Sequence, residues 1–166
     1  MAAAVQVTGP AEIQVGTGAA GALEKFGYTR NGAEIVSEGY WINVPGDENG
    51  GDEGPPIDVQ FIGETARIRV ELTKWDTTAA AEVESRFVGG TGGVPGAAGT
   101  LMFSGSKAMR LLVKPTTGAR NFPRAFPRFA IEVNKGTRFS TLVVEFEAHK
   151  DATGVLWNTS IVGAAA

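Results

Sequence analysis

The strongest pattern in this sequence is a strict alternation of apolar and polar residues in two segments. Residues 66–73 place Ala, Ile, Val and Leu at even positions and mainly charged residues at odd positions, and residues 141–148 alternate in the same manner. Because side chains two apart share one face of a strand, each segment predicts a strand with one buried and one polar face. The charged residues on the two polar faces are Arg67, Arg69, Glu71, Glu145 and Glu147.

Two hairpins are predicted around these strands. Ile57, Val59 and Phe61 also alternate with polar residues, and Gly63-Glu64 is placed to form a turn, so residues 57–75 predict a β-hairpin. The segment Asp151–Gly154 predicts a turn after the second strand, with a return strand over residues 155–162. Weaker strand signals occur at Glu12–Val15, Glu34–Val44, Ala108–Val113 and Phe129–Val133.

Only one segment, from Asp76 to about Phe87, has the pattern of a helix. Asp76 is a suitable N-cap, and Ala79, Val83 and Phe87 recur at a spacing of four residues with charged residues between them. Glycine-rich residues 89–96 follow and end the predicted helix.

Composition extends this picture to a single mainly β domain over residues 1–166, with flexible ends at about 1–5 and 163–166. Glycine accounts for 23 of the 166 residues, which disfavours a helix bundle. We expect a β-sandwich or partly closed barrel of two hairpin-rich antiparallel sheets, with one flanking helix and long loops. The two longest irregular segments, 45–56 and 89–100, are predicted to be assembly surfaces that become ordered against identical neighbours.

Candidate catalytic and metal-binding chemistry is sparse. There is no cysteine, which excludes thiolate zinc sites and a thiol nucleophile. With one histidine, His149, most acid–base constellations lose their commonest component. Residues 16–21 match G-x-G-x-x-G, but the following segment is too short for a crossover helix, which favours a plain turn. The chain is therefore predicted to be no enzyme and to need no cofactor or metal. It lacks an apolar run of membrane-spanning length and a secretory signal, so synthesis in a cytoplasm is expected.

Charge is distributed unevenly along the chain. The segment 47–53 is acidic but does not match the spacing of an EF-hand calcium loop, which favours a solvated or partner-facing loop. Residues 107–128 hold six positive charges and no acidic residue. Pro123 and Pro127 are expected to break that basic segment, which disfavours nucleic-acid binding; plain surface charge is the other alternative. Opposite charges on one chain suit head-to-tail contact between identical subunits. The predicted contact residues are Asp47, Glu48, Asp52, Glu53, Arg120, Arg124 and Arg128.

Four segments together resemble the major tail tube proteins of long-tailed bacteriophages. They are VTGPAEIQVG at 7–16, LEKFGYTRNGAEI at 23–35, PPIDVQFIGETARI at 55–68, and FEAH to GVLWN within 146–158. The resemblance implies a virion protein whose hexameric rings stack head-to-tail into a tail tube, through which viral DNA passes without specific binding. Its implied partners are copies of itself and other tail proteins (terminator, baseplate or sheath), and no membrane contact is expected.

The resemblance also implies an inner channel wall, and the alternating strands supply candidates for it. The charged faces of strands 65–75 and 141–148 are the candidates, because Glu71, Glu145 and Glu147 would repel phosphate. Arg67 and Arg69 depart from a purely acidic wall, so either they pair with those carboxylates or their face points elsewhere. Alternatives are a capsid decoration protein and, more remotely, a carbohydrate-binding module or an enzyme using Glu145 and Glu147.

Overall fold

The computed structural model describes residues 3–7, 9–17, 22–46, 55–86, 108–115, 118–133 and 141–159. These residues form seven strands and one short helix, which confirms the prediction of a mainly β chain with one helix. The elements are β1 (Ala3–Val7), β2 (Ala11–Thr17), β3 (Leu23–Val44), β4 (Asp58–Trp75), α1 (Thr77–Ser85), β5 (Met109–Pro115), β6 (Arg120–Val133) and β7 (Thr141–His149).

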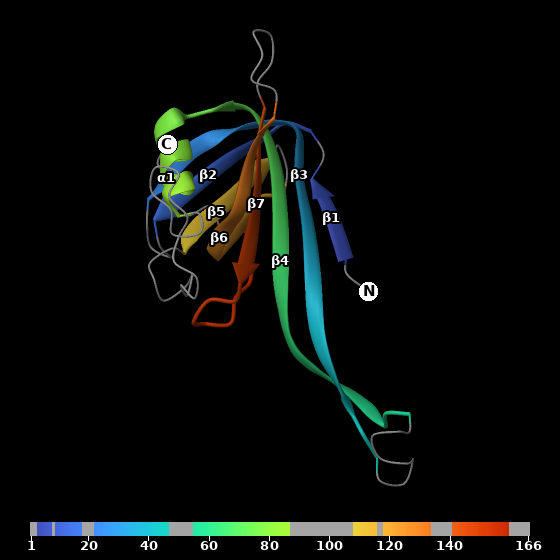
Figure 1. The fold of residues 1–166 in the computed structure, drawn as a ribbon. Coiled ribbons are helices and arrows are strands. Elements are labelled where there is room, and N and C mark those ends of the chain that lie inside the picture. The colour runs from blue at the N-terminus through green and yellow to red at the C-terminus, as the bar shows by residue number, and fades with distance from the viewer. Residues whose placement is uncertain are drawn as a thin grey trace.

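Six of these strands close into one antiparallel barrel (Figure 1). The order is β3-β2-β5-β6-β7-β4, and β4 pairs back onto β3 to complete the circle. The seventh strand, β1, adds to the outer edge of β3. The sequence also allowed a sandwich of two separate sheets. The structure instead has one continuous sheet, in which all seven described strands pair.

A bend in β3 makes this closure possible. The first part of the strand pairs with β2 and the second part with β4, and the pairing shifts between Thr29 and Ala33. Gly32 has a φ of 87°, a conformation that favours glycine. The buried Thr29 hydroxyl oxygen accepts hydrogen bonds from the amides of Ala11 (3.1 Å) and Gly32 (3.0 Å), which fixes the corner.

The barrel interior is filled by apolar side chains from its own strands and from α1. Phe26 and Phe146 meet edge to face with ring centroids 6.5 Å apart, and both are fully buried. Ala79 and Val83 of α1 join this core. Asp76 caps the helix by accepting a hydrogen bond from the Ala79 amide at 2.9 Å, as predicted. The predicted end at Phe87 lies outside the described residues.

The hairpin predicted for residues 57–75 is wrong, because β4 is one continuous strand. Its partner is β3, and the pairing shifts where Tyr40 lies opposite Gly63 while Trp41 lies opposite Phe61. Ile62 is therefore an extra residue, which identifies a β-bulge. The apolar positions change from odd to even across this point, and a bulge changes the alternation without reversing the chain.

The return strand predicted for residues 155–162 is also wrong for its described part. The turn at Asp151–Gly154 forms, with Gly154 at a φ of 82°. However, β7 already pairs with β4 on one edge and β6 on the other, so it has no free edge for a returning strand. Instead, Leu156 enters the core, and Asn158 bridges to Asn121 of β6.

The four weaker strand predictions all fall on observed strands, but β3 and β6 are much longer than expected. β6 continues through Pro123 and Pro127, which were expected to break it. Both prolines lie at or beside shifts in strand pairing, where a missing amide hydrogen bond is tolerated. Most of the two predicted long loops, residues 47–54 and 89–100, lies outside the described part of the chain.

Replacing Phe146 tests the position of the core. The change Phe146→Ala removes a fully buried ring, so the free energy of unfolding should fall by about 3–5 kcal/mol. The control Ile42→Ala removes an exposed side chain and should change it by about 0.5 kcal/mol or less. Denaturant unfolding measures both, and equal losses would contradict the assigned core.

The turn after β7 should give a measurable pH dependence. Hydrogen bonds from the Thr153 hydroxyl (2.7 Å) and the Val155 amide (2.9 Å) hold the pKa of the Asp151 carboxyl below its usual value. Because the folded pKa is lowered, this stabilisation is present above the unfolded pKa and is lost as pH falls through the folded pKa.

Asp151→Ala should therefore lower the melting temperature at neutral pH, and its difference from the parent should shrink in acid. Thr153→Val, which removes the hydroxyl donor, should raise the pKa of Asp151 in an NMR titration. A melting-temperature difference that is independent of pH would contradict this account.

Candidate functional site

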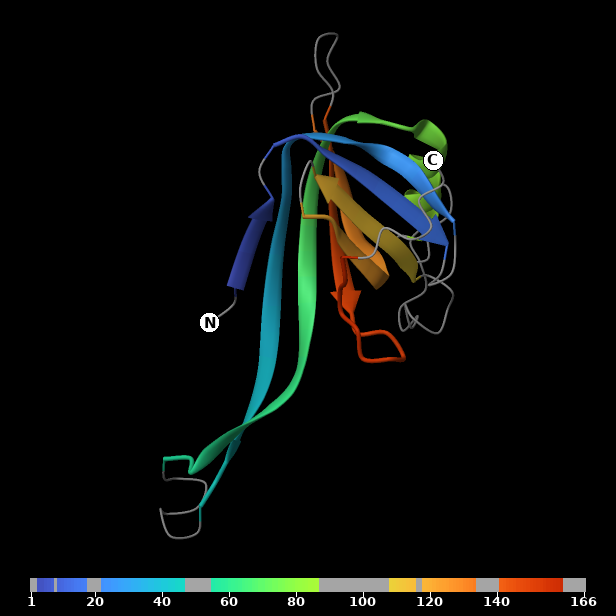
Figure 2. The ribbon, with the colours of Figure 1, turned by 180° about the vertical axis from the view of Figure 1, so that it is seen from behind.

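Beyond the barrel, β3 and β4 continue as a two-stranded projection, here called the arm (residues 38–46 and 55–64), which points away from the body in both views (Figures 1 and 2). β7 pairs with β4 only over residues 65–72, and β1 pairs with β3 only over residues 33–37. Within the described ranges, both outer edges of the arm are therefore without a partner strand. Unpaired edges are ready to accept another strand.

The arm also carries nearly all of the large exposed hydrophobic residues among the side chains whose exposure the structure describes. Seven of these eight lie on it, and the eighth is Trp157. Large exposed apolar side chains gathered on one element mark an interaction site. The seven are Tyr40, Trp41, Ile42, Ile57, Val59, Phe61 and Ile62.

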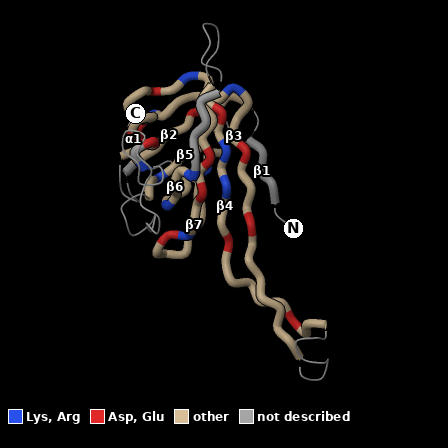
Figure 3. Tube along the Cα trace, viewed as in Figure 1, with Lys and Arg blue, Asp and Glu red and all other residues tan. Residues whose placement is uncertain are grey.

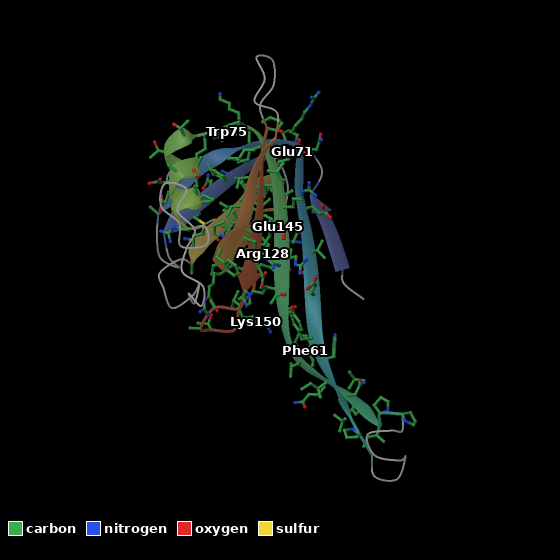
Figure 4. All side chains as sticks on the ribbon, viewed as in Figure 1. Phe61, Glu71, Trp75, Arg128, Glu145 and Lys150 are labelled. Atoms are coloured by element: carbon green, nitrogen blue, oxygen red, sulfur yellow. The ribbon has the colours of Figure 1, made fainter. Side chains whose placement is uncertain are left out.

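Apolar side chains occur on both faces of the arm. Trp41 and Phe61 pack together with centroids 4.8 Å apart, on the face that continues the core side of the barrel. At the base of that face, the Lys150 ammonium lies 5.3 Å from the Phe61 ring centroid and 3.7 Å from a Glu64 carboxylate oxygen (Figure 4). Tyr40 and Ile42 lie on the opposite face. One flat partner could not cover both faces.

The charged residues of the described arm are all acidic: Glu38, Asp58 and Glu64. The four carboxylates predicted to make subunit contacts, Asp47, Glu48, Asp52 and Glu53, belong to the segment that joins its two strands and lie outside the described residues.

A second surface is the outward side of β3, β4 and β7, here called the charged face (Figure 3). It brings together all five residues predicted to line a channel. Arg67 lies directly opposite Glu147 of β7, Arg69 lies opposite Glu145, and Glu71 follows on β4.

Two further glutamates of β3 complete this surface. Glu34 lies opposite Arg69, so this guanidinium stands between two glutamates in one cross-strand row. Glu38 lies 3.9 Å from Arg67 Nε. Sequence reasoning left out Glu34 and Glu38, although both belong to the predicted strand 34–44 and share its alternation. The arginines of the charged face are thus surrounded by carboxylates, with an excess of negative charge.

Glu147 links the charged face to β6. One carboxylate oxygen lies 3.0 Å from Arg128 Nη1, and the other lies 2.8 Å from His149 Nε2. The ring of Phe126 stacks on His149 at 6.0 Å. Arg128, predicted to receive an acidic loop from another subunit, therefore has a carboxylate partner within its own chain.

The other two predicted receivers lie in different surroundings. Arg124 donates a hydrogen bond to the Lys150 carbonyl at 3.4 Å. The Arg120 guanidinium lies 4.0 Å above the centroid of the Trp157 ring, and these two residues are here called the platform. The three arginines thus have separate partners and do not act as one cluster.

The platform is held firmly against the barrel. The buried Asn121 amide donates to the Asn158 side-chain oxygen at 3.0 Å and accepts from Arg110 Nε at 3.1 Å. The backbones of Asn121 and Asn158 also exchange two hydrogen bonds of 2.9 Å. These contacts fix the residues that flank Arg120 and Trp157 in the sequence.

Two features are absent from the residues that the structure describes. These residues contain no cluster of three or more His, Asp or Glu side chains suited to a metal ion. In the same ranges, no helix has both the length and the apolar character needed to cross a membrane.

The chain matches no protein-family model, and no curated protein matches it either. The arm, the charged face and the platform therefore carry the functional interpretation.

Removing the two carboxylates that flank Arg69 should make the charged face attract phosphate. The double variant Glu34→Gln/Glu145→Gln should bind duplex DNA more tightly than the parent. Its affinity should fall with rising salt, with a logarithmic slope of about 0.9 for each additional phosphate that it neutralises. The matched control Glu24→Gln/Glu84→Gln removes the same charge from exposed positions elsewhere. Fluorescence anisotropy at low and high salt measures this, and equal affinities for the two double variants would contradict it.

Proposed function

We propose that this chain is a structural virion protein that self-assembles into stacked rings forming the tail tube of a bacteriophage. The observation that carries the proposal is the arm. In the described chain no strand pairs with its two outer edges, and large apolar residues are exposed on both of its faces. The resemblance in four sequence segments supports the same function, and it alone supplies hexameric rings stacked head-to-tail.

Self-association follows from the physical character of the arm. Burying apolar surface contributes about 25 cal/mol per Å², and pairing an open edge satisfies backbone groups as well. A second copy of the chain is present wherever the first is made. Contact between two different surfaces of identical copies propagates into closed rings or open filaments.

The charged face supports a channel wall. Its arginines have glutamates as cross-strand neighbours, and the remaining carboxylates give the face an excess of negative charge. Such a surface repels the phosphates of DNA, which lets DNA pass without specific binding. In this proposal Arg67, Arg69, Glu71, Glu145 and Glu147 line the channel together with Glu34 and Glu38.

The remaining parts of the proposal concern partners and place. The protein acts in the virion tail after synthesis in the host cytoplasm, and other tail proteins bind the ends or the outside of the tube. It has no catalytic role and needs no cofactor. The acidic segment 47–53, with Asp47, Glu48, Asp52 and Glu53, belongs to the surface that contacts a neighbouring subunit.

Assembly by the purified protein tests this function. We expect rings or tubes with a central channel in negative-stain micrographs at high concentration. Trp41→Ser/Phe61→Ser should abolish them, because it removes the aromatic pair of the arm. Its unfolding free energy should change little, by about 0.5 kcal/mol for each exposed site.

The matched control is Glu24→Ser/Lys74→Ser, which alters two exposed residues outside the arm and should assemble normally. Monomers of the parent protein at high concentration would contradict the proposed function. Discrete dimers or trimers without a channel would favour a capsid decoration protein.

A further inference from the structure

We propose that the arm of one copy docks on the platform, Arg120 and Trp157, of a second copy. This inference rests on the proposed function and goes beyond it by naming the surface that receives the arm. It begins from the apolar residues: among the side chains whose exposure the structure describes, Trp157 is the one large exposed hydrophobic residue outside the arm.

Trp157 has the properties of an anchor for a binding partner. The residue is 42% exposed, while the preceding residue, Leu156, is buried in the core and the following residue, Asn158, is hydrogen-bonded to Asn121. The backbone on both sides of the ring is therefore fixed before any partner arrives, which lowers the entropy cost of binding. Tryptophan and arginine are also enriched among the residues that dominate binding energy.

Charge makes the two surfaces complementary. The charged residues of the described arm are all acidic. The platform contains Arg120, and the strands beneath it, β5 and β6, add further basic residues. Opposite potentials favour contact between arm and platform and disfavour contact between two arms. One of these basic residues is Arg110, which donates a hydrogen bond to Asn121 next to Arg120. Lys114 and Arg124 belong to the same two strands.

The topology directs this contact to a second copy. The platform is attached to the start of β6, and in the barrel order β7 separates β6 from β4, while β5 and β2 separate it from β3. The arm itself leaves the barrel at the β3–β4 pair and points away from the body (Figures 1 and 2). Because arm and platform are different surfaces, their contact is heterologous and can propagate.

The absence of cysteine from the sequence allows a direct cross-linking test. Two single variants, Val59→Cys on the arm and Thr159→Cys beside Trp157, are mixed and treated with a short bis-maleimide reagent. Any cross-link between the two positions then joins different copies. The control mixture replaces Thr159→Cys with Thr73→Cys, an exposed position on β4 outside the arm.

We expect cross-linked pairs in the Val59/Thr159 mixture at a yield at least about 10-fold above the control mixture, as suits a specific interface. Trp157→Ala should abolish this excess, whereas Trp157→Phe, which keeps an aromatic ring beneath Arg120, should retain most of it. Thermal unfolding of both variants separates loss of docking from loss of fold.

The outcomes separate this inference from the proposed function. Rings that form while Val59 cross-links only to Val59, or equally to the control position, would overturn the docking and leave the tail tube proposal standing. Monomers without cross-links would overturn both. Cross-links between Val59 and Thr159 in particles without a channel would support the docking and contradict the tail tube.

Discussion

The pairing of β3 with β4 is the interaction on which the rest of the structure depends. It closes the barrel at one point, because the bend at Thr29–Gly32 lets β3 pair with β2 first and with β4 afterwards. It also continues beyond the stretch that β1 and β7 cover. The same pairing therefore creates a sealed core and an arm that the described chain leaves exposed. A two-stranded ribbon alone is marginally stable in water, so this arm has a physical reason to associate.

The charged face depends on the same register. Arg69 lies in a row between Glu34 and Glu145 only because three antiparallel strands place these residues directly opposite one another. A shift of one residue in β4 would turn its arginines inward and its apolar residues outward, so the buried side fixes the charged side. The barrel core and the proposed channel wall thus come from a single alternating pattern. The arginines have carboxylate neighbours on the adjacent strands, which suits a surface that meets DNA without holding it.

The sequence predicted the strands with one buried face well, because alternation directly records burial. It also predicted the helix and its cap at Asp76. The sequence prediction failed near Gly63, where the same local signal can indicate a turn or a bulge. A turn was predicted there, but the pairing of this segment with Tyr40 and Trp41 of β3 makes it a bulge. The pairing of Arg128 with Glu147 and the stacking of Arg120 on Trp157 depend on strand order, which local patterns do not reveal. The exposure of Phe61 was hidden as well, since its alternation with polar residues alone suggested a buried face.

Amide hydrogen exchange of the arm tests the central claim most directly. In a dilute monomer, the outward-pointing amides of residues 38–44 and 58–64 should exchange rapidly, because no strand covers them. On assembly these amides should become strongly protected, whereas the amides of residues 66–72, already paired on both sides, should change little. Arm amides that exchange equally fast in monomer and assembly would contradict the claim that the arm is the surface through which copies of this chain associate.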